Sequence, residues 1–277
     1  MVLYYAMGGG LGHLVRAEAF LLMKRITGFR VITASPYAVK IFDPDRLVIS
    51  PREFEDHVKL LTEYFQGILE KYKPDKVIID TFSHGILGEL NGINWRNTEV
   101  IYITRRLKWE KYRSKVPGPG IFSETHILEP IEPDHLEFIQ HSCRKIIQAV
   151  ISYPVHRIDP ANRWALPADK EKWVIVHSGP DKEVDRLIDL TFEMARLEGS
   201  HPMIFVNSQD RPRSGEVEWS NQYPVRGYFP FFRRIITACG FNSINETAPY
   251  RDRHRFFPFE RKYDDQFWRA QQAKKNG

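Results

Sequence analysis

Residues 235–246 read Ile-Ile-Thr-Ala-Cys-Gly-Phe-Asn-Ser-Ile-Asn-Glu. The first of them are apolar and β-branched, which is typical of a buried strand. A turn at Cys239-Gly240 follows, and then Asn242 or Ser243 can cap a helix that carries Glu246 in its first turn. Because the first N–H groups of a helix have no partner within it, such a junction can hold an anion. The same pattern also fits an ordinary capped junction of an α/β domain.

The composition indicates a folded protein of ordinary polarity. The chain has 277 residues, of which 42% are hydrophobic and 27% charged, enough for one large or two modest domains. The net charge of +5 fits a phosphate-bearing ligand or an anionic membrane surface, and it is too small to indicate nucleic acid. Cys143 and Cys239 have no metal-ligand spacing, so we expect reduced thiols in a cytoplasmic protein. Neither a signal peptide nor a membrane-spanning run is expected.

Strands and helices alternate along both halves of the chain. The expected elements cover residues 2–7, 14–26, 29–34, 53–72, 76–80, 84–90, 99–104, 173–177, 182–197, 202–206, 255–259 and 264–274. Repeated β–α order predicts mostly parallel sheets with helical crossovers. We therefore expect an α/β protein of two Rossmann-like domains facing a central cleft, over residues 1–154 and 173–277, with a linker at 155–172.

A glycine-rich loop, Gly8-Gly9-Gly10-Leu11-Gly12-His13, follows the first expected strand. Its glycines let the backbone approach another group closely. The loop departs from the dinucleotide fingerprint, because His13 stands where the third glycine belongs, and it lacks the Lys-Ser/Thr of a P-loop. We expect it to hold a ligand near His13 at the carboxyl edge of the sheet, although a structural histidine fits the pattern equally well.

Asp80 ends the expected strand at 76–80, and His84 follows four residues later. The carboxyl ends of parallel strands face the ligand in folds of this class. Asp80 can therefore orient His13 and stabilise its imidazolium while His13 takes a proton from a hydroxyl group. The alternative is that Asp80 caps the next helix.

Three other stretches are candidate binding elements. The basic, aromatic loop at 105–125 is either an acceptor- or membrane-facing loop or a plain solvated one. His177-Ser178-Gly179-Pro180 either brings Ser178 to a phosphate or forms a simple turn. Asp264-Asp265-Gln266 either binds sugar hydroxyls or complements the dipole of the last helix.

Taken in chain order, the glycine loop, the Ser178-Gly179 turn and the stretches 239–246 and 264–270 resemble the GT-B glycosyltransferases. In particular they resemble the family of the peptidoglycan lipid-intermediate N-acetylglucosaminyltransferase (glycosyltransferase family 28-like). The resemblance implies an inverting, metal-independent enzyme with no cofactor. It would move a sugar, an N-acetylhexosamine or a hexose, from a UDP-sugar to an acceptor hydroxyl. The alternatives are a UDP-N-acetylglucosamine 2-epimerase-like enzyme and a non-catalytic nucleotide-sugar-binding subunit.

The resemblance also implies roles for individual residues. The donor-binding residues would be Ser178, Gly179, Tyr228, Phe229, Gly240, Phe241, Asn242, Ser243, Glu246, Asp265 and Gln266. Within this set, the residues from Gly240 hold the diphosphate, Glu246 binds the ribose, the Tyr228 region flanks the base, and Asp265 and Gln266 contact the sugar.

On the acceptor side, His13 and Asp80 would be catalytic, beside a loop of Gly9, Gly10, Gly12 and His84. The acceptor is a small molecule, a lipid-linked molecule or a glycan. The implied location is the cytoplasm, with peripheral contact at the inner face of the membrane. A basic run at 249–255 replaces the usual small turn of the family; it either adds phosphate contacts or marks a changed donor site.

Overall fold

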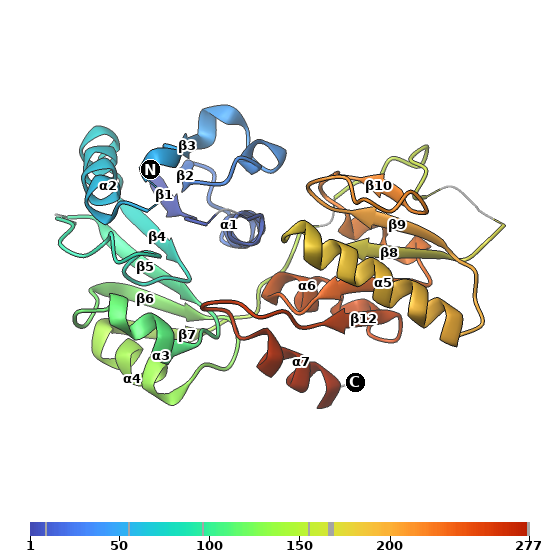
Figure 1. Ribbon diagram of the computed structural model, residues 1–277. Coiled ribbons are helices and arrows are strands. Elements are labelled where there is room, and N and C mark those ends of the chain that lie inside the picture. The colour runs from blue at the N-terminus through green and yellow to red at the C-terminus, as the bar shows by residue number, and fades with distance from the viewer. Residues whose placement is uncertain (9, 55, 96, 155, 166–168, 276–277) are drawn as a thin grey trace. The chain divides into compact units, whose positions relative to one another are not determined.

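The computed structural model describes residues 1–8, 10–54, 56–95, 97–154, 156–165 and 169–275 (Figure 1). The chain divides into two compact units. Unit 1 comprises Met1–Pro154 and Lys262–Asp264, and unit 2 comprises Val155–Arg261 and Asp265–Gly277. A short segment near the end of the chain thus belongs with the first unit, whereas the helix that follows it belongs with the second. The linker expected at 155–172 stays a prediction.

Unit 1 contains a seven-stranded sheet in the order β3-β2-β1-β4-β5-β6-β7. Every pair of neighbouring strands runs parallel, so all the carboxyl ends meet at one edge. The strands are β1 Val2–Tyr5, β2 Phe29–Thr33, β3 Leu47–Ile49, β4 Lys76–Asp80, β5 Glu99–Thr104, β6 Phe122–Ile127 and β7 Cys143–Gln148. The helices are α1 Gly12–Met23, α2 Val58–Tyr72, α3 Trp109–Tyr112 and α4 Pro133–Ser142.

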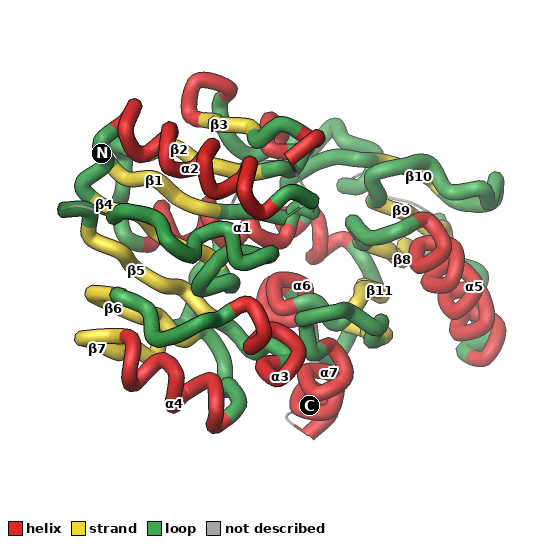
Figure 2. The backbone as a smooth tube through the Cα atoms, turned by 60° about the vertical axis from the view of Figure 1, so that its left-hand side comes forward, coloured by secondary structure: helices red, strands yellow, loops and turns green. Residues whose placement is uncertain are grey.

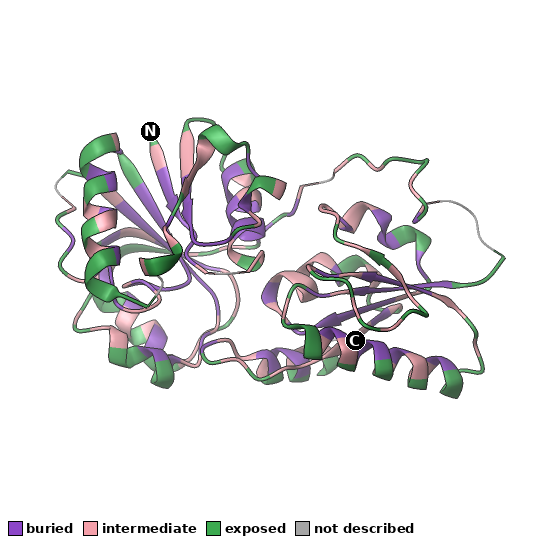
Figure 3. Ribbon diagram, turned by 45° about the horizontal axis from the view of Figure 1, so that its top comes forward, coloured by how far each residue is buried: buried purple, intermediate pink, exposed green. Residues whose placement is uncertain are grey.

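Helices cover both faces of this sheet, which explains why its central strands are apolar throughout. Tyr4 and Tyr5 are neighbours on β1 and point to opposite faces. Tyr4 packs among residues of α1 such as Phe20, and Tyr5 packs against Phe65 of α2. All of the inner part of β4, Val77 to Ile79, is buried. In Figure 3 the strands of the sheets carry much of the purple that marks buried residues. A strand buried on both faces is typical of a parallel sheet between two helical layers.

Unit 2 repeats this plan with five parallel strands in the order β10-β9-β8-β11-β12. The strands are β8 Lys172–Val176, β9 Met203–Asn207, β10 Glu218–Ser220, β11 Arg234–Ala238 and β12 His254–Phe257. The helices are α5 Asp181–Leu197, α6 Phe241–Glu246 and α7 Gln266–Lys275, drawn in red in Figure 2. Trp173 and Leu187 lie in the core between the sheet and α5, and Trp164 and Phe205 lie in the core of the other face. The expected pair of parallel, Rossmann-like sheets is confirmed.

The helix expected at 84–90 does not form, and the segment is a series of turns. Gly85 and Gly88 have φ angles of +85° and +95°, which a right-handed helix does not allow. The buried carboxylate of Glu89 accepts hydrogen bonds from the N–H groups of Ile86 and Leu87, at 3.1 and 2.8 Å. The side chain of Glu89 therefore stabilises turns in place of the regular hydrogen bonds of a helix. Within the described residues, no helix is long and apolar enough to cross a bilayer.

Candidate functional site

The carboxyl edge of unit 1 brings His13 and Asp80 into contact. Asp80 is the last residue of β4, and His13 is the second residue of α1, which follows the neighbouring strand β1. The distance from His13 Nδ1 to Asp80 Oδ2 is 2.5 Å. Asp80 is fully buried and 15% of the His13 side chain is exposed. Asp80 therefore orients the histidine ring, which sequence reasoning had proposed, and does not cap a following helix.

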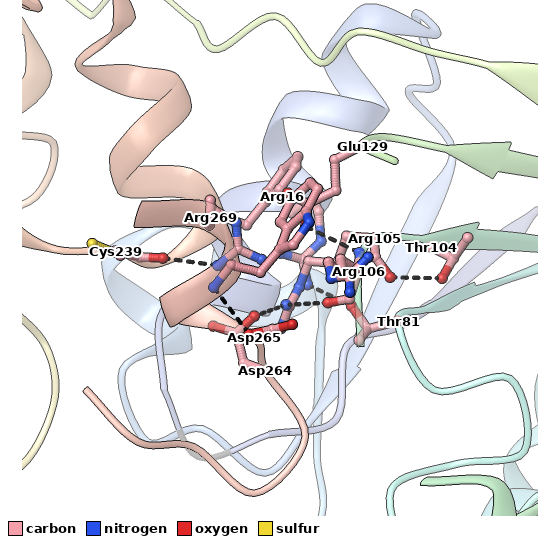
Figure 4. Close-up of polar contacts among 12 residues, drawn as sticks. Arg16, Thr81, Thr104, Arg105, Arg106, Glu129, Cys239, Asp264, Asp265 and Arg269 are labelled. Carbon is pink, nitrogen blue, oxygen red and sulfur yellow. Dashed lines mark hydrogen bonds and ion pairs between the residues drawn. The ribbon is translucent and has the colours of Figure 1, made fainter. Parts of the chain in front are cut away.

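Arg16 is a third member of this cluster, and sequence reasoning missed it. Its Nε donates to Asp80 Oδ1 at 2.7 Å, and its Nη2 donates to Asp80 Oδ2 at 2.6 Å and to Thr81 Oγ1 at 2.8 Å. Figure 4 labels the side chains of Arg16 and Thr81. Residues three apart on a helix share a face, so the spacing of His13 and Arg16 was an available signal. The result is a planar, two-pronged ion pair beneath the His13–Asp80 contact.

The charges in this cluster follow from burial and pairing. Burial raises the pKa of Asp80, but the Arg16 guanidinium and His13 outweigh it and hold that pKa well below its usual range. Burial lowers the pKa of His13, and Asp80 offsets this only in part. At neutral pH the pair is therefore a carboxylate and a neutral imidazole. The Nδ1 proton of His13 lies toward Asp80, and Nε2 is the nitrogen that can take a proton.

The glycine loop shapes the space around His13. A Cβ added to Gly8 would lie 2.7 Å from His13 Cδ2, so only glycine fits against the ring. A Cβ on Gly10 would meet nothing within 4 Å. Gly12, expected in the loop, is instead the first residue of α1. Gly9 lies outside the described residues.

His84 has a different environment from His13. Its Nδ1 lies 3.0 Å from Ser83 Oγ, and its ring packs against Phe138. Burial lowers the pKa of His84 to about 4, so the ring is neutral at physiological pH. The ring closest to His13 among those with a described contact is Phe82, with centroids 5.7 Å apart.

Two aromatic residues of the loop at 105–125 belong to the core. Trp109 is stacked on His135 with ring centroids 4.1 Å apart, and Tyr112 is fully buried. The loop is also fixed by charge, because Arg105 donates a hydrogen bond to Asp264 (Figure 4). Asp264 thereby joins the returning segment of the chain to the residue after β5 of unit 1, and the partner of this loop stays a prediction.

The β11–α6 junction in unit 2 differs from its expected form. Gly240 is the residue before the helix, and neither Asn242 nor Ser243 caps it with a side chain. Glu246 is the last residue of this six-residue helix, so it does not stand in the first turn. Phe241 is buried. The junction nevertheless lies at the carboxyl edge of the central strand β11, where ligands bind in parallel sheets.

A second polar cluster lies at the neighbouring junction, after β8. His177 Nε2 is 2.7 Å from Glu183 Oε2, and Arg261 donates to both carboxylate oxygens of Glu183. Burial raises the pKa of Glu183, but His177 and Arg261 together lower it to about 2. A Cβ on Gly179 would lie 2.4 Å from His177 Nε2. The turn with Ser178 and Gly179 is therefore packed directly over this cluster, which the sequence did not reveal.

Four of the expected donor residues have structural contacts, and their role toward a donor stays a prediction. Tyr228 and Phe229 are buried in the core, at 7% and 1% exposed. The Oδ1 atom of Asp265 accepts a hydrogen bond from the N–H of Trp268 at 3.1 Å and caps α7. Gln266 is 4% exposed, and its carbonyl accepts the N–H of Phe259 at 3.0 Å.

The basic run at 249–255 lies away from the ligand edge of its own sheet. Most of it precedes β12, and Arg255 pairs in register with Ile236, the third residue of the parallel strand β11. Arg251 and Arg253 are therefore at the amino edge of this sheet, opposite the edge that carries α6, which favours the alternative of a changed donor site. Over the described residues, no group of three His, Cys, Asp or Glu side chains could hold a metal ion.

Comparisons with known proteins identify the fold. No family model and no curated protein matches the sequence. Among solved structures, the glycotransferase of kitacinnamycin has a TM-score of 0.61 at 15% identity, covering 99% of this chain and 84% of that one. Arabidopsis thaliana UGT89C1 complexed with UDP-L-rhamnose has a TM-score of 0.53 at 13% identity, covering 99% and 82%.

A third structure, UDP-N-acetylglucosamine 2-epimerase from Rickettsia bellii, has a TM-score of 0.59 at 12% identity, covering 90% of this chain and 76% of that one. The fold is of the GT-B type. Identities this low show the fold alone, and the same architecture carries both transferases and epimerases.

Proposed function

We propose that this protein transfers a sugar from a UDP-sugar to an acceptor hydroxyl with inversion at the anomeric carbon. The observation that carries the proposal is the contact of His13 Nδ1 with the buried Asp80, and the lowered pKa values of both groups favour a neutral ring beside a carboxylate. A general base must be neutral at the working pH and must be oriented by a partner, and His13 meets both requirements.

In the reaction, His13 Nε2 takes the proton of the acceptor hydroxyl as its oxygen attacks the anomeric carbon. The bond from that carbon to the diphosphate breaks, and UDP leaves with the bonding electrons. Asp80 stabilises the resulting imidazolium, as the aspartate of a hydrolytic triad does. The charge on the leaving diphosphate is balanced by backbone N–H groups and needs no metal ion.

We assign the donor to unit 2 and the acceptor to unit 1. Gly240, Asn242 and Ser243 at the start of α6, with Ser178 and Gly179 after β8, are the proposed diphosphate contacts, and Glu246 is the proposed ribose contact. The resemblance to the peptidoglycan lipid-intermediate family supports an N-acetylhexosamine donor, a cytoplasmic location and a lipid-linked acceptor met at the membrane surface.

The test is a screen of UDP-sugars against acceptor panels, with products identified by mass spectrometry. His13→Ala should lower turnover by roughly 10²- to 10⁴-fold, because it removes general-base catalysis, while UDP binding measured by calorimetry stays the same. His57→Ala, an exposed histidine at the start of α2, is the matched control and should leave turnover unchanged. Equal turnover of His13→Ala and the parent protein rules out this role for His13.

A second candidate is an epimerase that acts on the UDP-sugar without an acceptor. The TM-score of 0.59 to the 2-epimerase lies between the scores of 0.61 and 0.53 to the two transferases. Incubation with UDP-N-acetylglucosamine alone separates the two, since an epimerase yields the 2-epimer, detectable by proton NMR. Tight UDP binding with neither reaction would indicate a non-catalytic binding subunit.

A further inference from the structure

Arg16 forms hydrogen bonds to both carboxylate oxygens of Asp80, so the charge of Asp80 does not act on His13 alone. The guanidinium bonds both carboxylate oxygens, and Asp80 Oδ2 is shared between Arg16 Nη2 at 2.6 Å and His13 Nδ1 at 2.5 Å. The side chains of Arg16 and Asp80 are 3% and 0% exposed. Water therefore does not screen this pair, and each charge acts strongly on the neighbouring ring.

We propose that Arg16 is a positioning residue that fixes Asp80 against His13 and offsets its charge, so that His13 is oriented without being made a stronger base. The role of His13 in proton transfer rests on the proposed function. An unpaired carboxylate beside a histidine favours the imidazolium form. With Arg16 in place, the carboxylate still holds the Nδ1 proton, but its attraction for a second proton on the ring is largely cancelled.

The surroundings of Arg16 hold the guanidinium in place. Thr81 Oγ1 accepts from the same Nη2 at 2.8 Å, and the backbone of Thr81 has a φ of +71°. That conformation is unfavourable for a β-branched residue. It turns the chain immediately after β4 while the N–H of Thr81 donates to Ile103 at 2.7 Å. The strain lies at the residue that completes the coordination of Arg16.

The other charged or titratable groups that act on this cluster do not replace Arg16. Tyr4 on β1 reaches Asp80 Oδ1 at 3.4 Å, and burial together with Asp80 keeps its pKa well above 10, so it stays neutral. Arg105, after β5, acts on His13 through its charge and lowers the pKa of the ring in the same direction as Arg16. Arg105 is itself paired with Asp264. Arg16 is thus the cation that directly bonds Asp80 among the described contacts.

The experiment measures the titration of the His13 ring by NMR in the full-length protein, with no substrate present. Arg16→Met should raise the pKa of His13 by about one unit, a tenfold gain in proton affinity. Arg16→Lys keeps the charge and should leave the titration close to that of the parent while lowering kcat, because the two-pronged geometry is lost. Arg52→Met, at an exposed arginine, is the control for removal of a positive charge.

The pH–rate profile gives the matching kinetic result. Activity rises with pH as His13 loses its proton, so a higher pKa in Arg16→Met moves the acid limb of kcat/KM to higher pH by the same amount. KM for the UDP-sugar should change less than twofold. If Arg16→Met does not fold, Arg16→Gln keeps an N–H donor toward Asp80 without the charge and should show the same shift.

An unchanged His13 titration in a folded Arg16→Met or Arg16→Gln protein would overturn the proposal and leave Arg16 a structural residue. The outcome is separable from the proposed function, because the titration needs no substrate. A shifted titration in a protein that transfers no sugar would uphold the electrostatic role and remove the transferase assignment.

Discussion

The carboxyl edges of the two sheets are built alike but are used differently. In unit 1 the polar side chains that the sequence singled out, His13 and Asp80, are in direct contact. In unit 2, the side chains of Asp265 and Gln266 are engaged by the backbone around α7. A motif residue at a ligand edge can therefore either present its side chain to chemistry or hold the edge together.

Under the proposed function, the difference has a physical basis in the task that we assign to each edge. A proton-transferring pair needs side chains removed from water and paired with each other, which unit 1 provides with a buried carboxylate and a buried guanidinium. Binding of a diphosphate can rest on backbone N–H groups and small residues, so the larger side chains around it remain available for structural bonds. Arg269 illustrates this in unit 2, because it is buried and donates to the carbonyl of Cys239 at 2.8 Å (Figure 4).

The largest expected effect is the loss of the buried carboxylate of unit 1. Asp80→Ala leaves the Arg16 guanidinium buried without its partner, which should lower the free energy of unfolding by about 3–5 kcal/mol. Urea unfolding with hydrogen exchange of peptides from each unit measures it, and the loss should be confined to unit 1. Asp56→Ala is the control: it removes an exposed carboxylate of the same unit, and stability should stay the same. Equal losses of stability in the two variants would contradict the view that the buried ion pair stabilises the edge of unit 1.

A smaller effect should follow from filling the space beside His13. Gly8→Ala puts a methyl group 2.7 Å from His13 Cδ2, so the ring must move relative to Asp80. A misplacement of this size should lower kcat roughly tenfold to a hundredfold. Gly28→Ala adds the same group in open space outside the site and should behave like the parent protein. The measurement is the turnover of the purified variants, compared at equal folded fraction. A lower turnover of Gly8→Ala alone means that the glycine is needed for close packing against His13.

Much of the fold could be predicted from the sequence because its signals are local. The apolar run Val77-Ile78-Ile79 and the amphipathic helix α2 each identify their own structure, and their alternation predicts a parallel sheet. The pairing of His13 with Asp80 could also be anticipated, since both follow neighbouring strands at the same edge. The spacing of His13 and Arg16 places them on one helix face, but the sequence does not say which atoms of Asp80 the guanidinium bonds.

The sequence was least informative where a side chain serves the backbone of a distant residue. Nothing in the Asp265-Gln266 pattern indicates that the amide of Gln266 meets the N–H of Phe259 seven residues earlier. Likewise, Tyr228 was assigned to a base, but its hydroxyl accepts the N–H of Asp159. These contacts depend on how loops fold over the sheet edge, which neither periodicity nor motif spacing encodes.

The smallest expected effect tests the structural use of Gln266 in unit 2. Gln266→Ala leaves the N–H of Phe259 without its acceptor, which should lower the free energy of unfolding by about 1–3 kcal/mol. Because the amide is bonded within the protein and only 4% of the residue is exposed, the affinity for the UDP-sugar should be the same as in the parent. Thermal unfolding and calorimetry measure the two quantities on the same samples. Gln271→Ala, at an exposed glutamine of the same helix, should change neither. A loss of donor affinity without a loss of stability would instead mean that Gln266 contacts the sugar, and that the two edges are used alike.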